Sequence, residues 1–210
     1  MDLHSAAYAV DPKVSSGPGP RDEHITNLLV LGFLQSCCSC SFHEELQVLG
    51  RELLSEAELA DSYDCCSYDD DELQTDGNHA SFLQMGRAEA GSESQEEVIR
   101  NIARRLAQIG DRMDHHIQPE LLNNLVVEFV NDHSEEDRRR RLASAVEQAM
   151  ETWPADMERE KATLMLTMLL AKKLAEHTPS LLRAAFRAAV TLINQDLLAY
   201  VRNLAGNGME

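Results

Sequence analysis

Histidine, cysteine and carboxylate side chains could do chemistry in this chain, but their spacing matches no catalytic or metal-binding motif. The stretch from His43 to Gln47 begins like the zinc motif HExxH and lacks its second histidine. The acidic run at 69–72 lacks the glycine and the ligand spacing of an EF-hand loop. His115 and His116 are expected at a solvated helix end. We therefore predict that the chain is not an enzyme and uses no metal and no cofactor.

The cysteines form two short clusters, and their number is odd. Their pattern contains neither CxxC pairs nor a disulfide framework. The N-terminus, MDLHSAAYAV, has no basic segment followed by an apolar one, which a secretory signal peptide requires. We expect reduced thiols in a cytoplasmic chain. The cysteines are Cys37, Cys38, Cys40, Cys65 and Cys66.

The acidic side chains are concentrated in the first part of the chain. The net charge of -17 argues against a nucleic-acid partner, because binding to a phosphate backbone depends on clustered lysine and arginine. Residues 1–76 contain sixteen acidic and only three basic side chains. Loss of this part would therefore remove most of the repulsion between the chain and an anionic lipid surface.

One segment has the pattern of a helix that binds in a groove. From residue 98 to residue 113, apolar side chains recur at intervals of four, four, three and four positions. At about 100° per residue they fall within an arc of about 80°, and the arginines lie elsewhere on the wheel. Such a helix docks into one hydrophobic groove, either of its own fold or of a partner. Spacing alone favours an ordinary core-facing helix. The residues of this apolar seam are Val98, Ile102, Leu106, Ile109 and Met113.

A protease could act on the acidic segment that precedes this helix. Residues 55–92 show no sustained helical or strand period, so we expect a long disordered loop. Loops of this length within a compact domain usually have a function. The stretch from Leu73 to Gly77, LQTDG, places Asp76 before a glycine, where a protease can bind an extended chain without unfolding the domain. By sequence alone this match to a cleavage site is weak.

The remaining signals predict an all-α fold. Hydrophobic residues make up 43% of the chain and aromatic residues only 5%, which suits interlocking helices. Ser94 and Glu97 form a capping box that opens the candidate ligand helix, 95–114. We expect a single bundle of about eight helices over residues 22–206, with a disordered tail at 1–21. The other helices are expected near 25–34, 42–53, 119–131, 134–152, 156–176 and 178–206, the last with a break near Asn194.

The helix expected near 156–176 contains the most apolar run of the chain, residues 162–171. Ten helical residues span only about 15 Å, whereas the hydrocarbon core of a bilayer is about 30 Å thick. The run is therefore predicted to be the central helix of the bundle and not a transmembrane span. Pro154 is expected in its first turn.

The segment IARRLAQIGDRMD, residues 102–114, resembles the ligand helix of BH3-only death agonists of the Bcl-2 family. Further stretches, at 21–37, 71–78, 134–143, 169–183 and 200–210, extend the resemblance over residues 21–210. It implies a Bcl-2-like bundle in which apolar side chains of this helix fill pockets of a partner's groove. The residues that the resemblance implies for partner binding are Val98, Ile99, Ile102, Ala103, Leu106, Ile109, Gly110, Asp111 and Met113.

Two features of that set come with the resemblance. Ala103 and Gly110 would let the two backbones approach closely, because they lack bulky side chains. The resemblance also assigns Asp111 to a salt bridge with an arginine of the groove. An ideal helical wheel places Asp111 far from the apolar seam, so geometry alone does not predict that pairing.

The same resemblance implies a proteolytic switch. Asp76 is the expected residue on the amino side of the bond that an initiator caspase cuts, and Gly77 followed by Ser81 fits an N-myristoylation acceptor. The C-terminal fragment would move from the cytoplasm to lipids of the mitochondrial outer membrane. There it would engage Bax/Bak-like effectors and survival proteins, and promote outer-membrane permeabilisation and cytochrome c release.

Two alternatives belong to other functional classes. A groove-bearing survival protein would show an asparagine-tryptophan-glycine-arginine motif, whereas the single tryptophan, Trp153, lies in a Thr-Trp-Pro-Ala stretch. A helical adaptor without a proteolytic switch would resist caspase and would bind no Bcl-2-type groove.

Overall fold

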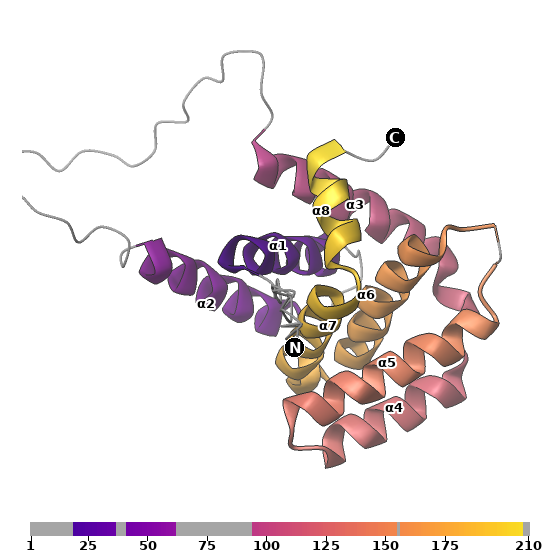
Figure 1. The fold of residues 1–210 in the computed structure, drawn as a ribbon. Helices are drawn as coiled ribbons and strands as arrows, with labels where there is room; N and C mark the ends of the chain where they lie inside the picture. Colours follow the sequence, from indigo (N-terminus) through magenta and orange to yellow (C-terminus); the bar gives the residue numbers. More distant parts are fainter. Residues whose placement is uncertain (1–18, 37–40, 62–93, 155, 208–210) are drawn as a thin grey trace, which may run out of the picture.

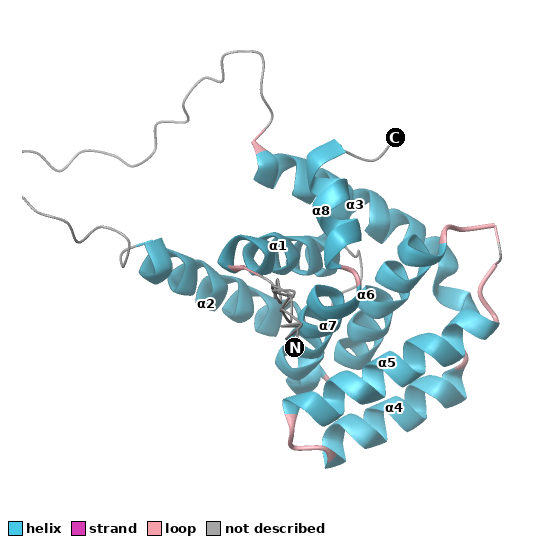
Figure 2. Ribbon diagram, in the orientation of Figure 1, coloured by secondary structure: helices cyan, strands magenta, loops and turns pink. Residues whose placement is uncertain are grey.

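The computed structural model describes residues 19–36, 41–61, 94–154 and 156–207, without the side chains of residues 54–61. These residues form eight α-helices, two short 3-10 turns and no strand, which confirms the predicted all-α class (Figure 2). The helices are α1 (Pro20–Ser36), α2 (His43–Asp61), α3 (Gln95–Met113), α4 (Pro119–Asn131), α5 (Glu135–Glu151), α6 (Arg159–His177), α7 (Leu182–Asp196) and α8 (Leu198–Asn207).

Helix α6 is the central helix, as the apolar run at 162–171 predicts. Twelve of its residues are buried, on every side of the helix. It packs against α5 and α7, and it also touches α4, α1 and α3 (Figure 1). None of the helices in the described ranges is both long enough and apolar enough to cross a membrane.

The start of α6 differs from the prediction. The helix begins at Arg159, so Pro154 is not in its first turn. The amides of Thr152 and Trp153 bond to the carbonyls of Ala149 and Met150, which ends α5 in a tight turn. Trp153 is 7% exposed and belongs to the core, and Pro154 lies in the connection between the two helices.

Helix α2 is longer than predicted. It reaches Asp61, whereas the sequence suggested an end near residue 53 and a loop from 55 onwards. Glutamate, leucine and alanine dominate residues 52–60, and all three favour helix strongly enough to continue it. The rest of the predicted loop, residues 62–92, lies outside the described residues, as does most of the predicted tail.

Helix α3 begins as its capping box predicts. Ser94 is extended, and its hydroxyl accepts a hydrogen bond of 3.4 Å from the backbone N–H of Glu97. At the other end of the chain, the predicted break near Asn194 falls at Leu197, between α7 and α8. The turn Pro179–Leu181 precedes α7, so Thr178 and Pro179 open a 3-10 turn before the helix.

Helix α1 lies between α2 and α3 and also packs on α7 (Figure 1). One buried polar contact fixes it to α7: the hydroxyl of Thr26 donates to the side-chain oxygen of Asn194 over 2.6 Å. A buried polar group without a hydrogen-bond partner costs free energy, so this hydrogen bond favours the observed position of α1 on α7. This contact therefore joins residues that precede the predicted cleavage site to residues that follow it.

Candidate functional site: the helix 95–113 and its surroundings

The apolar side of α3 faces the interior of the protein. Ile99, Ile102 and Leu106 are at most 2% exposed, and Ala103 is completely buried. Three residues of the apolar seam are only partly buried, and they pack against the edge of the core. The structure therefore conceals most of the candidate ligand surface. The three partly buried residues are Val98, Ile109 and Met113.

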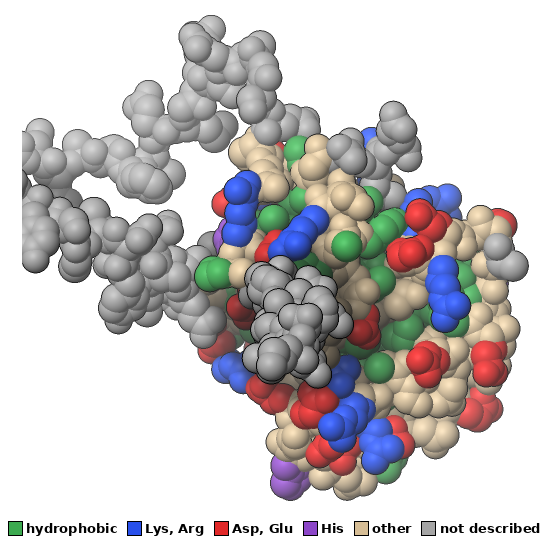
Figure 3. Space-filling view, in the orientation of Figure 1, with side chains coloured by type: hydrophobic (Ala, Val, Ile, Leu, Met, Phe, Trp, Pro, Cys, Tyr) green, Lys and Arg blue, Asp and Glu red, His purple; other side chains and the backbone are tan. Residues whose placement is uncertain are grey.

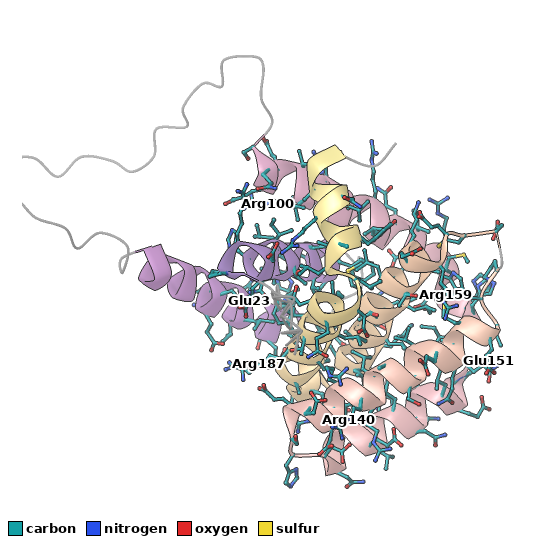
Figure 4. All side chains as sticks on the ribbon, viewed as in Figure 1. Glu23, Arg100, Arg140, Glu151, Arg159 and Arg187 are labelled. Atoms are coloured by element: carbon teal, nitrogen blue, oxygen red, sulfur yellow. The ribbon has the colours of Figure 1, made fainter. Side chains whose placement is uncertain are left out.

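The opposite side of α3 is charged and exposed, as the wheel predicts. Arg100, Arg104, Arg105 and Arg112 are all exposed. Arg100 lies near α1 in the view of Figure 4 and forms an ion pair of 3.6 Å with Glu96, one turn earlier. Such exposed pairs within a helix contribute little to stability, so burial of the apolar face must position α3.

Helix α1 covers α3 through two close approaches at glycine. A Cβ atom built on Gly32 of α1 would lie 3.0 Å from the Cβ of Ala103. A Cβ atom on Gly110 of α3 would lie 3.1 Å from the ring of Phe33, again from α1, and 3.8 Å from Leu169 of α6. Side chains and backbone of α1 and α6 thus already fill the space beside the small residues of α3.

Polar contacts add to the interface between α1 and its neighbours. The guanidinium of Arg21 donates to the side-chain oxygen of Gln95 over 2.7 Å, and His24 lies 3.6 Å from Glu96. Arg202 of α8 binds both carboxylate oxygens of Asp22, at 2.7 and 2.6 Å. Hydrogen bonds from Arg202 and from the N–H of Gly19 lower the pKa of Asp22 from 3.8 to about 2.

The C-terminal end of α3 is bound to α6 by two ion pairs. The ammonium of Lys172 lies 2.8 Å from Asp111, and that of Lys173 lies 2.5 Å from Asp114. Glu176 is the second carboxylate for each lysine, at 3.7 and 3.3 Å. Burial opposes the charge on Lys173, but its bond to Asp114 and the attraction of Glu176 outweigh this and raise its pKa.

Other sequence candidates lie apart from this site. Asp76, Gly77 and all the cysteines are outside the described residues. His43 pairs with Gln47 over 2.9 Å, and no group of residues in the described ranges could hold a metal ion. His115 is exposed as predicted, whereas His116 is partly buried with its ring 5.7 Å from that of Trp153. Acidic and basic side chains are intermixed on the face shown in Figure 3.

Comparison with known proteins identifies the family of the chain. The family model described as BH3 interacting domain (BID) matches residues 12–207. This chain belongs to the BID family. A relative from Mus musculus named BH3-interacting domain death agonist is 53% identical over 203 residues, 96% of this chain and 100% of that protein. A Gallus gallus protein of the same name is 39% identical over 181 residues, 85% of this chain and 92% of that protein.

Membership in this family makes the chain a pro-apoptotic BH3 protein and a regulator of cell death, not an enzyme. The match from residue 12 also extends into the predicted tail, where the sequence alone showed no resemblance.

Sequence reasoning missed the residues that surround α3. Lys172 and Lys173 end the apolar run of α6, and a lysine that directly follows such a run was the available signal. Gly32 interrupts the apolar stretch at 25–34, which is a signal for close helix packing. Neither pattern indicates which helix the residue would face, so the partners could not be named.

The two glycines of α1 and α2 provide a matched test of the cover. Gly32→Ala should make the protein about 1–3 kcal/mol less stable than Gly50→Ala, because overpacking against Ala103 outweighs the gain in helix propensity. A Cβ on Gly50 meets only ordinary contacts, at 3.8 Å or more. Urea unfolding of both variants measures the difference. Equal stability would mean that α1 can shift away from α3 at no cost.

Titration of Asp22 tests the contact between α1 and α8. Its pKa is lower in the folded protein than the ordinary 3.8, so the contact stabilises the fold fully above pH of about 4 and is lost as the pH falls toward about 2. Arg202→Met should raise the pKa of Asp22 toward 3.8, as carbon NMR of its carboxyl group can show. Arg183→Met, which removes a partner of Glu52, is the control. A pKa that stays near 2 without Arg202 contradicts the assignment.

Proposed function

We propose that the chain is a latent BH3 ligand, activated when an initiator caspase cuts after Asp76. The supporting observation is the burial of the apolar seam beneath α1, because α1 precedes Asp76 and α3 follows it. In the uncut chain, the helix that would bind a partner is bound by the protein's own N-terminal part.

Cleavage changes the energetics of this cover without changing any contact. While the chain is intact, α1 and α3 are linked, and the effective concentration of one for the other is high. After the cut, attachment of residues 22–76 becomes bimolecular, so a partner or a membrane can compete for the same surface. The fragment that leaves also carries most of the net negative charge.

The exposed helix would bind a Bcl-2-type groove through the residues that α1 and the core now bury. The apolar seam together with Ile99 would fill successive pockets, and Ala103 and Gly110 would allow close approach of the backbones. Asp111 would pair with an arginine of the groove. Its exposed fraction of 37% shows that it lies at the edge of the buried surface.

The resemblance to BH3-only death agonists implies where the C-terminal fragment would act. Gly77 would become the new N-terminus and accept a myristoyl chain, which alone binds membranes only marginally. The fragment would move from the cytoplasm to the mitochondrial outer membrane, where α6 and α7 lie along the lipid. It would engage Bax/Bak-like effectors, or be held by survival proteins, and promote permeabilisation and cytochrome c release.

Release of cytochrome c from isolated mitochondria tests the switch. Caspase-treated protein should cause strong release, and intact protein should cause little. Treated Asp76→Ala protein should behave like intact protein, because it keeps the link between α1 and α3. Equal release by all three would refute the proteolytic switch, and no release by any would favour the adaptor alternative.

A peptide of residues 92–116 tests the ligand helix separately from the fold. In the intact protein, Leu106→Ala would disturb the core, since Leu106 is completely buried. In the peptide, the same change should weaken binding to a Bcl-2-type groove protein by about 2 kcal/mol or more, the range of a well-packed anchor residue. Gln108→Ala, on the exposed side, should have little effect. Equal affinities of the two peptides would contradict the assignment of the apolar seam.

A further inference from the structure

Two ion pairs bind α6 to Asp111 of α3 and to Asp114, the residue directly after α3, and they differ from the exposed pairs elsewhere on the surface. The side chain of Lys172 is only 6% exposed, and its ammonium is bound by Asp111 and Glu176. A buried ammonium is costly unless carboxylates compensate for the lost water. Movement of α3 away from α6 would remove Asp111 from this group, so α3 cannot leave without a change around Lys172.

The position of this contact along α3 is as informative as its burial. Gly110, next to Asp111, lies between Phe33 of α1 and Leu169 of α6. In its C-terminal half, α3 therefore lies against both α1 and α6 at Gly110. The polar contacts of the N-terminal half, at Gln95 and Glu96, are made with α1.

The two helices that contact the C-terminal half of α3, α1 and α6, would belong to different fragments of the cleaved chain. Helix α1 precedes Asp76, whereas α6 follows it and stays in the same fragment as α3. Departure of the N-terminal fragment would remove Phe33 and the contacts at Gln95 and Glu96. It would leave the pairs of Asp111 with Lys172 and of Asp114 with Lys173 in place.

We propose that Lys172 and Lys173 form a second autoinhibitory contact, which keeps the C-terminal half of α3 on α6 after the chain has been cut at Asp76. The inference rests on the proposed function of α3 as a groove ligand. Lys172 forms an ion pair with the carboxylate of Asp111, the group that would pair with an arginine of the groove. A partner must therefore displace Lys172, or α6 must move first, before Asp111 becomes available.

Hydrogen exchange in a double-mutant cycle tests this contact in the full-length chain, both uncut and cut with the fragments still together. With Lys172 present, Asp111→Asn should speed exchange of the amides from Leu106 to Met113 by on the order of tenfold. In the Lys172→Met background, the same change should have no effect. The cycle cancels the separate gain from burying the methionine side chain.

Two controls separate a local contact from general destabilisation. Lys172→Arg should keep the exchange of α3 close to that of the unmodified protein, because it retains the cation. The amides of α5, from Leu142 to Ala149, should keep their protection in every variant. The proposal would be overturned if Asp111→Asn sped exchange equally in the Lys172 and Lys172→Met backgrounds. It would also be overturned if exchange in α5 sped up by the same factor.

The exchange result and the proposed function can fail separately. The peptide of residues 92–116 contains no part of α6, and its binding to a groove protein tests the ligand assignment alone. If the peptide binds, cut Lys172→Glu protein should bind the groove protein on the order of tenfold more tightly than cut unmodified protein. Unchanged affinity of that variant would overturn the second contact while leaving the ligand assignment intact.

Discussion

The close packing of α1 on α3 is the constraint on which the rest of the structure depends. Gly32 and Ala103 bring the two helices so close that a Cβ atom added at Gly32 would lie only 3.0 Å from the Cβ of Ala103. Small residues such as Gly32 and Ala103 allow this close approach of the two backbones. Under the proposed function, α1 and the groove of a partner would use the same surface of α3, so packing of α1 would exclude the partner.

The surroundings of α3 divide it into two halves with different attachments. The N-terminal half makes its polar contacts with α1, and the C-terminal half is also fixed to α6 by buried or partly buried ion pairs. The contacts of Thr26 with Asn194 and of Asp22 with Arg202 fasten α1 to α7 and α8. Because these contacts join segments on both sides of residue 76, the proposed cleavage after Asp76 would weaken the assembly without dismantling it.

Much of this architecture could be predicted from the sequence. The capping box at Ser94 and the spacing of the apolar seam define α3, and the apolar run at 162–171 defines the central helix. The end of α2 and the start of α6 were misplaced, because strong helix formers extend the first and burial of Trp153 delays the second. The partner of Asp111 could not be predicted, since a pair between residues 61 positions apart depends on how α3 and α6 pack.

The affinity of the uncut protein for a groove protein, compared with that of the peptide 92–116, tests the central claim most directly. If α1 and α6 conceal the helix, only a small fraction of the uncut molecules can bind at any moment. The apparent affinity of the uncut protein is then the affinity of the free helix multiplied by that fraction. The account predicts binding at least about 100-fold weaker for the uncut protein than for the peptide. Equal affinities would contradict it, because the helix would then be available without any cut and α1 would not act as its cover.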